Sequence, residues 1–218
     1  MESLENQFLI AMPSLDDSFF NKTVTYICEH DEEGAMGLII NLPVSLNLSE
    51  LLKQIEPESE TNSTSQSQVS KPHSKKGPST SETKTRLKLA SNDEQNIQLQ
   101  QRVLSGGPVS QQRGFVLHSK QSGWSSSLSL NDQLMVTTSK DILLALGTED
   151  APDNFIVTLG YASWGPGQLE QELKDNSWLT TPVDADIIFN TPVELRWKKA
   201  TEKLGIDLAH LSTDVGHA

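Results

Sequence analysis

The stretch from residue 154 to residue 174 reads NFIVTLGYASWGPGQLEQELK, and it decides the fold. Its first eight residues are apolar almost throughout, which is typical of a strand in the centre of a sheet. Two glycines and a proline follow, and then Leu169 and Leu173 are spaced by one helical turn. The stretch therefore predicts a central strand, a tight turn and a helix.

Toward the N-terminus, short apolar segments at 8–12, 23–28 and 36–42 predict further strands. Residues 23–28 alternate with a period of two, as in a half-buried strand. The polar, glycine-ended segment 30–34 predicts a hairpin loop between the second and third strands. Residues 47–55 combine Asn and Glu three positions apart with apolar residues on one face, which predicts a capped helix.

Toward the C-terminus, the pattern continues with short extended segments and single helices. Residues 139–147 predict a short helix between a serine cap and a glycine stop. Segments 178–183 and 185–190 follow, and a last helix begins at Thr191-Pro192 and ends before Gly205, with Leu195, Trp197 and Leu204 as its apolar side. Strands in runs with helices inserted singly favour an α+β fold, a single compact domain with a largely antiparallel sheet and a few short helices.

One internal segment departs from this pattern. Residues 57–86 hold eight Ser, five Thr and three Pro, with Val69 as their single hydrophobic residue. Such a composition cannot bury enough apolar surface to offset the entropy of ordering the backbone. We therefore expect one domain formed by 1–56 and 99–218, with 57–98 as a disordered Ser/Thr-rich insertion.

Composition excludes several functions. The chain of 218 residues has 17 basic and 29 acidic side chains, a net charge of −12, so direct DNA binding is not expected. No apolar run approaches the roughly 18 residues that a membrane span requires. A single cysteine and the absence of a signal-like N-terminus predict a cytoplasmic protein.

No cofactor or metal is predicted. The spacing of Gly160 and Gly165 resembles a phosphate-binding loop, but Pro166 and Gly167 stand where Lys and Ser or Thr are required. Gly106-Gly107-Pro108 lacks the third glycine of a dinucleotide site. No Cys or His pair has zinc spacing; Cys28 and His30 come nearest, on one side of a regular strand, and two ligands do not complete a site.

A nucleophile is the enzymatic alternative. Ser163 lies where the predicted strand turns into the helix, as a hydrolase nucleophile does, although Tyr161 replaces the first glycine of that motif. Ser163 as a simple turn or cap residue is the other interpretation. Cys28 has acidic neighbours that disfavour a thiolate, so it reads as a buried structural residue.

The ordered motifs closely resemble the bacterial YqgE/AlgH family over nearly the whole chain outside 57–98. The resemblance rests on segments at 8–13, 28–30, 34–38, 106–109, 113–118, 160–164, 167–170 and 216–218. It implies a compact cytoplasmic α+β domain and names no mechanism; one branch is described as a putative transcriptional regulator. Our leading hypothesis is a non-enzymatic regulatory or interaction protein whose protein or small-molecule partner is unknown. The alternatives are a hydrolase-like enzyme using Ser163 and a transcriptional regulator acting on DNA.

The sequence also predicts where a partner or ligand binds. The turn before the 168–174 helix offers free backbone N–H groups, and Gln168 and Glu172 lie side by side on that helix. We expect a shallow groove there, although these residues could instead lock the turn into the fold. The candidate residues of this groove are Trp164, Gln168, Glu172, Gly106, Gly107, His30 and His118.

Overall fold

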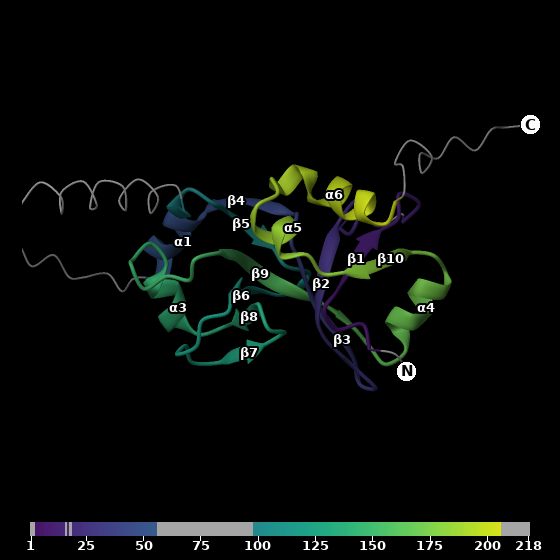
Figure 1. Cartoon of the computed structure of the whole chain (residues 1–218), viewed down its shortest axis with the longest axis horizontal. Helices are drawn as coiled ribbons and strands as arrows, with labels where there is room; N and C mark the ends of the chain where they lie inside the picture. The colour runs from purple at the N-terminus through teal and green to yellow at the C-terminus, as the bar shows by residue number, and fades with distance from the viewer. Residues whose placement is uncertain (1–2, 16, 18, 56–97, 206–218) are drawn as a thin grey trace, which may run out of the picture.

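The computed structural model describes residues 3–15, 17, 19–55 and 98–205 (Figure 1). Apart from Gln98, the insertion predicted at 57–98 lies outside the described residues, so its disorder stays a prediction. Within the described residues, no helix is both long and apolar enough to cross a membrane.

The described residues form strands and short helices in alternating runs. The strands are β1 (Gln7–Ala11), β2 (Val24–Asp31), β3 (Gly34–Ile39), β4 (Pro43–Asn47), β5 (Arg102–Ser105), β6 (Val109–Ser119), β7 (Ser127–Ser129), β8 (Leu134–Thr137), β9 (Phe155–Trp164) and β10 (Trp178–Pro182). The helices are α1 (Leu48–Ile55), α3 (Lys140–Ala145), α4 (Gln168–Lys174), α5 (Ala185–Phe189), the 3-10 turn η1 (Val193–Leu195) and α6 (Arg196–Lys203).

These strands join in one curled sheet. Its order is β10-β1-β2-β3-β9-β6-β8-β7, with β4 and β5 attached as a pair through β5 and β9. All pairings are antiparallel except that of β5 with β9. The predicted α+β domain with a largely antiparallel sheet is confirmed, and β9 is the central strand that its apolar sequence predicted.

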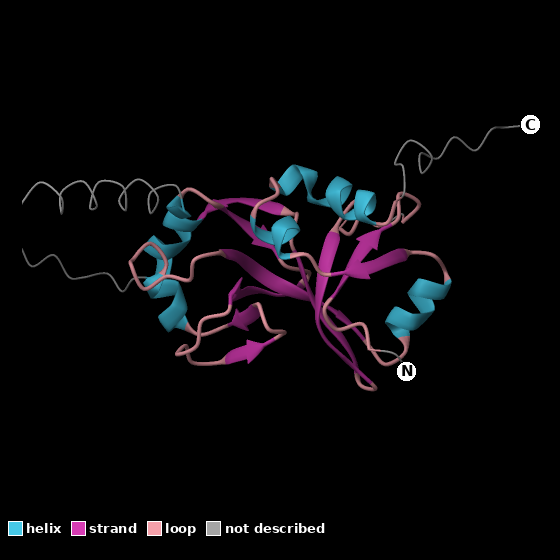
Figure 2. Cartoon of the chain, in the orientation of Figure 1, coloured by secondary structure: helices cyan, strands magenta, loops and turns pink. Residues whose placement is uncertain are grey.

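Both faces of the sheet are covered. Helices α5 and α6 pack on one face, over a cluster that includes Phe8, Tyr26 and Leu117 (Figure 2). On the opposite face, α1 and α3 cover one end and α4 covers the other. Because β2 lies between covered faces, its residues 24–28 are all buried, rather than half-buried as their alternation predicted.

Most local predictions hold. The hairpin loop joins β2 to β3, and Asp31 closes it by accepting a hydrogen bond from the Glu33 N–H. Asn47 and Glu50 bond each other's backbone N–H groups at the start of α1, which is the predicted capping box. Ser139 occupies the cap position of α3, but its hydroxyl bonds Asp141 instead of a backbone N–H.

The last helical region differs from its prediction. Residues 185–189 form α5, which Asp184 caps by accepting from the Asp186 N–H. The final helix begins as η1 and continues as α6. Its buried face includes Arg196, whose guanidinium donates to the Thr191 and Ile40 carbonyls, whereas Leu195 is 46% exposed. Burial lowers the pKa of Arg196 to about 10. Of the predicted apolar side, Trp197 and Leu204 do pack against the core, whereas Leu195 does not, and the buried Arg196, satisfied by carbonyls, was not predicted.

Two β-bulges change which way side chains point. In β2, the register with β3 shifts between Ile27 and Glu29, so Cys28 has no partner. Cys28 packs in the cluster beneath α5 and α6, whereas His30 contacts α4 on the opposite face. The prediction that Cys28 and His30 share one side of a strand is wrong, because it assumed a regular alternation.

The second bulge lies in β6, opposite Gly160 of β9. Residues 110–113 of β6 stand opposite this one glycine, because Val109 pairs with Tyr161 and Gly114 pairs with Leu159. Before the bulge, Ile156 faces the cluster beneath α5 and α6; after it, Tyr161 does. The alternation of β9 therefore reverses at Gly160, and Ser163 points away from the α4 face.

Candidate functional site

Three residues of the predicted groove are brought together by the structure. The Glu172 carboxylate on α4 accepts hydrogen bonds from the indole N–H of Trp164, at 2.9 Å, and of Trp178, at 2.8 Å. Gln168 donates its amide to the other Glu172 oxygen, at 2.8 Å, and accepts from the Gly165 N–H. The rings of Trp164 and Trp178 meet edge to face. These contacts support the locking role that the sequence left open, and ligand binding at these residues stays a prediction.

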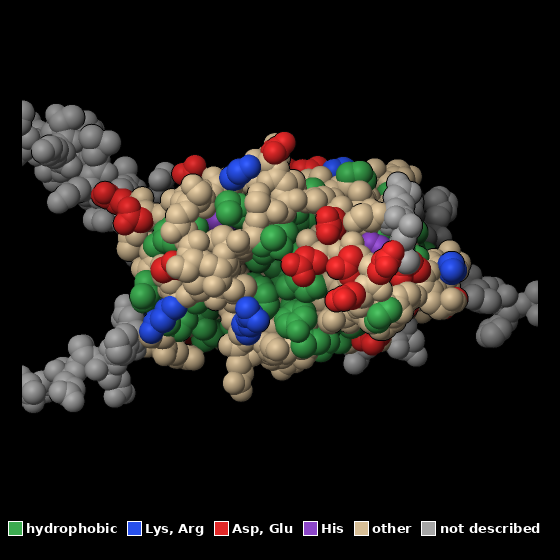
Figure 3. All heavy atoms as spheres, turned by 90° about the horizontal axis from the view of Figure 1, so that it is seen from below, with side chains coloured by type: hydrophobic (Ala, Val, Ile, Leu, Met, Phe, Trp, Pro, Cys, Tyr) green, Lys and Arg blue, Asp and Glu red, His purple; other side chains and the backbone are tan. Residues whose placement is uncertain are grey.

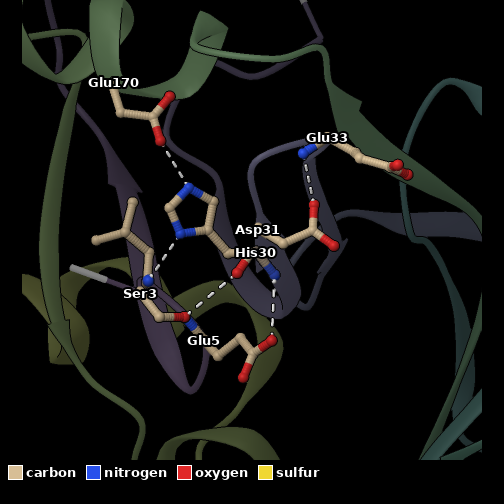
Figure 4. Close-up of polar contacts among 7 residues, drawn as sticks. Ser3, Glu5, His30, Asp31, Glu33 and Glu170 are labelled. Atoms are coloured by element: carbon tan, nitrogen blue, oxygen red, sulfur yellow. Dashed lines mark hydrogen bonds and ion pairs between the residues drawn. The ribbon is translucent and has the colours of Figure 1, made fainter. Parts of the chain in front are cut away.

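His30 lies at the other side of α4, against Glu170 (Figure 4). Its Nδ1 accepts from the Leu4 N–H at 2.9 Å, so the proton is on Nε2, which lies 2.7 Å from Glu170 Oε1. The backbone N–H of Glu170 and the His30 imidazole hold the pKa of the Glu170 carboxyl below its ordinary value. His30 is 6% exposed, so this pair joins the N-terminal segment, β2 and α4.

The remaining predicted residues lie apart from these. His118 is fully buried on β6 and pairs with Phe155, at the opposite end of β9 from Trp164. Gly106 and Gly107 lie against the backbone of residues 160–162. A Cβ at Gly107, where φ is +154°, would lie 2.0 Å from the Tyr161 carbonyl carbon, so this glycine serves close packing on β9.

A different hollow is open to solvent and is lined by apolar, hydroxyl-bearing and charged side chains. It has a volume of about 510 Å³ and opens between the β2–β3 hairpin and β7, on the side that Figure 3 views. We call it the groove. Its lining residues are Glu29, Met36, Arg113, Phe115, Ser126, Ser127, Leu128, Val136, Thr138, Tyr161 and Ser163.

Both bulges contribute to the groove. The bulge in β2 places Glu29 in the groove, and the bulge opposite Gly160 goes with the reversal that presents Tyr161 and Ser163 to the same hollow. The floor is apolar, because Phe115 and Val136 belong to the cluster beneath α5 and α6. The groove is therefore a place where the main hydrophobic core is reached from the surface.

Two side chains of opposite charge line the groove from different strands. Arg113 lies over the Phe115 ring, 5.4 Å from its centroid, and donates to Thr138 Oγ1 at 3.4 Å. Glu29 lies on β2, which β3 and β9 separate from β6, the strand of Arg113. A ligand in the groove therefore meets one cationic and one anionic side chain.

Ser163 lines the groove from within β9, opposite Met36. It belongs to the strand rather than to the turn, and the cap of α4 is Gly167, so the helix-cap interpretation is wrong. Neither described histidine serves it as a base. His30 bonds Leu4 and Glu170, and His118 bonds Ser119 and Thr137. In the described part of the chain, no group of three or more His, Cys, Asp or Glu could hold a metal ion.

Cys28 is buried and free. Burial raises the pKa of its thiol above the ordinary range, and the Glu29 carboxylate adds to this effect. The interpretation of Cys28 as a structural residue agrees with this environment.

The sequence did not identify most of the groove. Arg113, Met36, Leu128 and Glu29 are far apart along the chain, and no motif joins them. Two signals did exist: Leu128 is an apolar residue between serines, and Arg113 begins a strand-like run. Neither signal shows that the two residues share a hollow.

The curled, largely antiparallel sheet with a few short helices defines the class of fold to which the chain belongs. The chain belongs to the AlgH-like family (DUF179), whose model matches residues 8–209. It is 63% identical to a UPF0301 protein of Colwellia psychrerythraea and 48% identical to one of Pseudoalteromonas translucida, with full coverage of each chain.

Solved structures agree with this assignment. The solution structure of AlgH from Pseudomonas aeruginosa is 38% identical, with a TM-score of 0.68 and coverage of 100% of this chain and 99% of that one. A protein from Corynebacterium diphtheriae shares the fold at 18% identity, with a TM-score of 0.63 and coverage of 98% and 93%. The family resemblance seen in the sequence is confirmed, and the family's function is uncharacterised.

Proposed function

We propose that this AlgH-like protein is a non-enzymatic interaction module that binds a protein partner in the groove. The observation that carries the proposal is the groove itself, an open hollow lined by apolar side chains, several hydroxyl groups and one charge of each sign. Binding sites combine apolar walls with a few placed polar groups in this way. A reducing compartment suits the single, buried thiol of Cys28.

The exposure of apolar side chains supports this proposal. Leu128 is 40% exposed and Met36 is half-buried, and both line the groove. Tyr161 meets Phe115 edge to face at 5.7 Å, which gives the floor a rigid aromatic pair. Aromatic and Met side chains of this kind are enriched where partners bind.

Photo-crosslinking in cells tests the proposal. We would place p-benzoylphenylalanine at position 128 in the groove and, as a control, at position 195, which is 46% exposed on η1. We expect a discrete crosslinked protein from position 128 only. Ser163→Trp, which fills the groove, should remove the crosslink, whereas Ser45→Trp, an exposed serine on β4, should not. A crosslink that survives Ser163→Trp would overturn the proposal.

One observation favours a second candidate function: Ser163 is exposed within the groove, as a nucleophile would be. The engagement of both described imidazoles elsewhere argues against it. A fluorophosphonate probe distinguishes the two functions, since it labels activated serines. We expect no labelling; labelling that Ser163→Ala abolishes would establish the hydrolase alternative.

A further inference from the structure

We infer that the segment bound in the groove is basic and apolar: a large apolar side chain flanked by Lys or Arg, in extended conformation. This inference rests on the proposed function and specifies the chemistry of the partner. Three features of the groove carry it: the acidic side of the hollow, the apolar floor and the open strand edge.

The β2–β3 hairpin carries four carboxylates, of which Glu29 lines the groove. Glu29 lies in the groove, and Asp31, Glu32 and Glu33 follow it in the hairpin; we call these four the acidic wall. All four are exposed, and none forms an ion pair with another described residue. Acidic side chains gather beside the apolar surface on this side of the molecule (Figure 3).

The cationic side chains of the groove do not balance the acidic wall. Among the residues that the structure describes, Arg113 is the one cation that lines the groove, and its guanidinium already lies over the Phe115 ring and donates to Thr138. The acidic wall therefore carries four carboxylates against one guanidinium, so the charge of the hairpin side is not neutralised. A cationic segment therefore gains from the acidic wall, whereas an anionic one is repelled there.

The floor selects an apolar side chain. Phe115 and Val136 are buried, and Met36 and Tyr161 cover the floor only in part. A volume of about 510 Å³ accommodates a large side chain together with part of the backbone that carries it. Burial of such an anchor supplies affinity that the charges alone cannot, since exposed ion pairs contribute little.

The edge of the sheet favours an extended backbone. β7 is the last strand in the sheet order, and within the described residues it pairs with β8 alone. Its Ser127 and Leu128 line the groove, so the unpaired edge borders the hollow. Edge strands bind extended peptides through backbone hydrogen bonds, with alternate side chains entering pockets.

Four capped, fluorescent peptides test the inference by anisotropy with the full chain. They are Lys-Phe-Lys-Leu-Lys, Gln-Phe-Gln-Leu-Gln, Glu-Phe-Glu-Leu-Glu and Lys-Ser-Lys-Ser-Lys. We expect the first to bind at least about tenfold tighter than each of the others in 50 mM salt, and its advantage over the glutamine peptide to shrink in 0.5 M salt, where screening is stronger. Equal or tighter binding of the glutamine or glutamate peptide would overturn the inference, as would binding of the serine peptide.

Charge variants test whether the acidic wall causes the preference for the lysine peptide. We expect the affinity for the first peptide to fall about tenfold or more in a variant that combines Glu29→Gln, Glu32→Gln and Glu33→Gln. This variant keeps Asp31, which closes the turn by accepting from the N–H of residue 33. The control combination Glu149→Gln, Asp150→Asn and Asp153→Asn removes the same charge from exposed residues before β9 and should change affinity less than twofold. An equal loss in both combinations would indicate attraction by net charge only and would overturn the inference.

The variant Ser163→Trp distinguishes a failure of the inference from a failure of the proposed function. If the glutamine peptide binds as tightly as the lysine peptide and Ser163→Trp abolishes both, the groove binds segments without the expected charge preference; the inference fails and the proposed function stands. If no peptide binds, the inference fails, and the crosslink from position 128 decides the proposed function independently.

Discussion

At the scale of single residues, Glu172 shows how the fold uses side chains that sequence reasoning assigned to binding. One carboxylate accepts from two indole N–H groups and one amide, and so ties α4 to β9 and β10. Trp164 and Trp178 are nearly fully buried, so their N–H groups have no access to solvent. A buried donor left without its acceptor costs stability.

We therefore expect Glu172→Ala to lower the free energy of unfolding by roughly 2 to 4 kcal/mol, because two indole donors lose their acceptor. Urea denaturation measures the change. Gln171→Ala is the matched control, since Gln171 bonds only the exposed Asp175 on the outer side of the same helix; we expect a change within about 0.5 kcal/mol. An unchanged free energy of unfolding in Glu172→Ala would mean that the hydrogen bonds of Glu172 do not stabilise the turn before α4.

His118 predicts a pH dependence. Its Nδ1 donates to the Ser119 carbonyl, so Nε2 accepts from the Thr137 hydroxyl and the ring is neutral. Burial lowers the pKa of His118 from its ordinary value of 6.5. The unfolded chain then binds the proton more readily, so the stability that His118 contributes is complete above pH 6.5 and is lost as the pH falls below it.

Urea denaturation between pH 5 and pH 8 checks this expectation. His118→Gln should be less stable at pH 8, and its stability should fall less steeply toward pH 5 than that of the unmodified protein. The largest slope that one such group contributes is about 1.4 kcal/mol per pH unit. Parallel curves for the two proteins would contradict a neutral, buried His118.

At the scale of elements, the bulge of β6 opposite Gly160 shapes the groove. Gly160 adopts φ +73°, and residues 110–113 of β6 arch past it. A Cβ at this position would lie 2.6 Å from the Gly107 carbonyl oxygen and 2.8 Å from that of Val109. Only glycine combines this conformation with such close backbone contacts.

Gly160→Ala should lower the free energy of unfolding by roughly 2 to 4 kcal/mol, since backbone strain and a steric clash act together. Gly167→Ala is the control: φ is also +73°, but no atom lies within 4 Å of the added Cβ. We expect it to cost only the roughly 1 to 2 kcal/mol of a left-handed non-glycine residue. Equal losses in the two variants would show that the close approach at Gly160 carries no cost of its own.

At the scale of the whole molecule, charge sets the choice of partner. The chain carries a net charge of −12, and binding to duplex DNA depends on cations that displace counterions from phosphates. We expect no retention of promoter DNA in a gel-shift at about 0.15 M salt. Sequence-specific retention that resists added salt would contradict this expectation and favour the transcriptional alternative.

The sequence by itself determined the parts of this protein that depend on neighbouring residues. The capping box of Asn47 and Glu50, the hairpin loop closed by Asp31 and the central strand of β9 all follow from short-range patterns. The sequence motifs also identified the family, which the matched residues 8–209 confirm.

Only the tertiary structure decided which side chains meet. A bulge shifts the alternation of a strand by one residue, and no local pattern marked those at Cys28 and Gly160, so the orientations of Glu29 and Ser163 could not be predicted. Likewise, β7 and the β2–β3 hairpin face each other because the sheet curls, and curling is a property of all its strands together. The groove exists for these two reasons, since its residues come from six strands that only the folded sheet brings together.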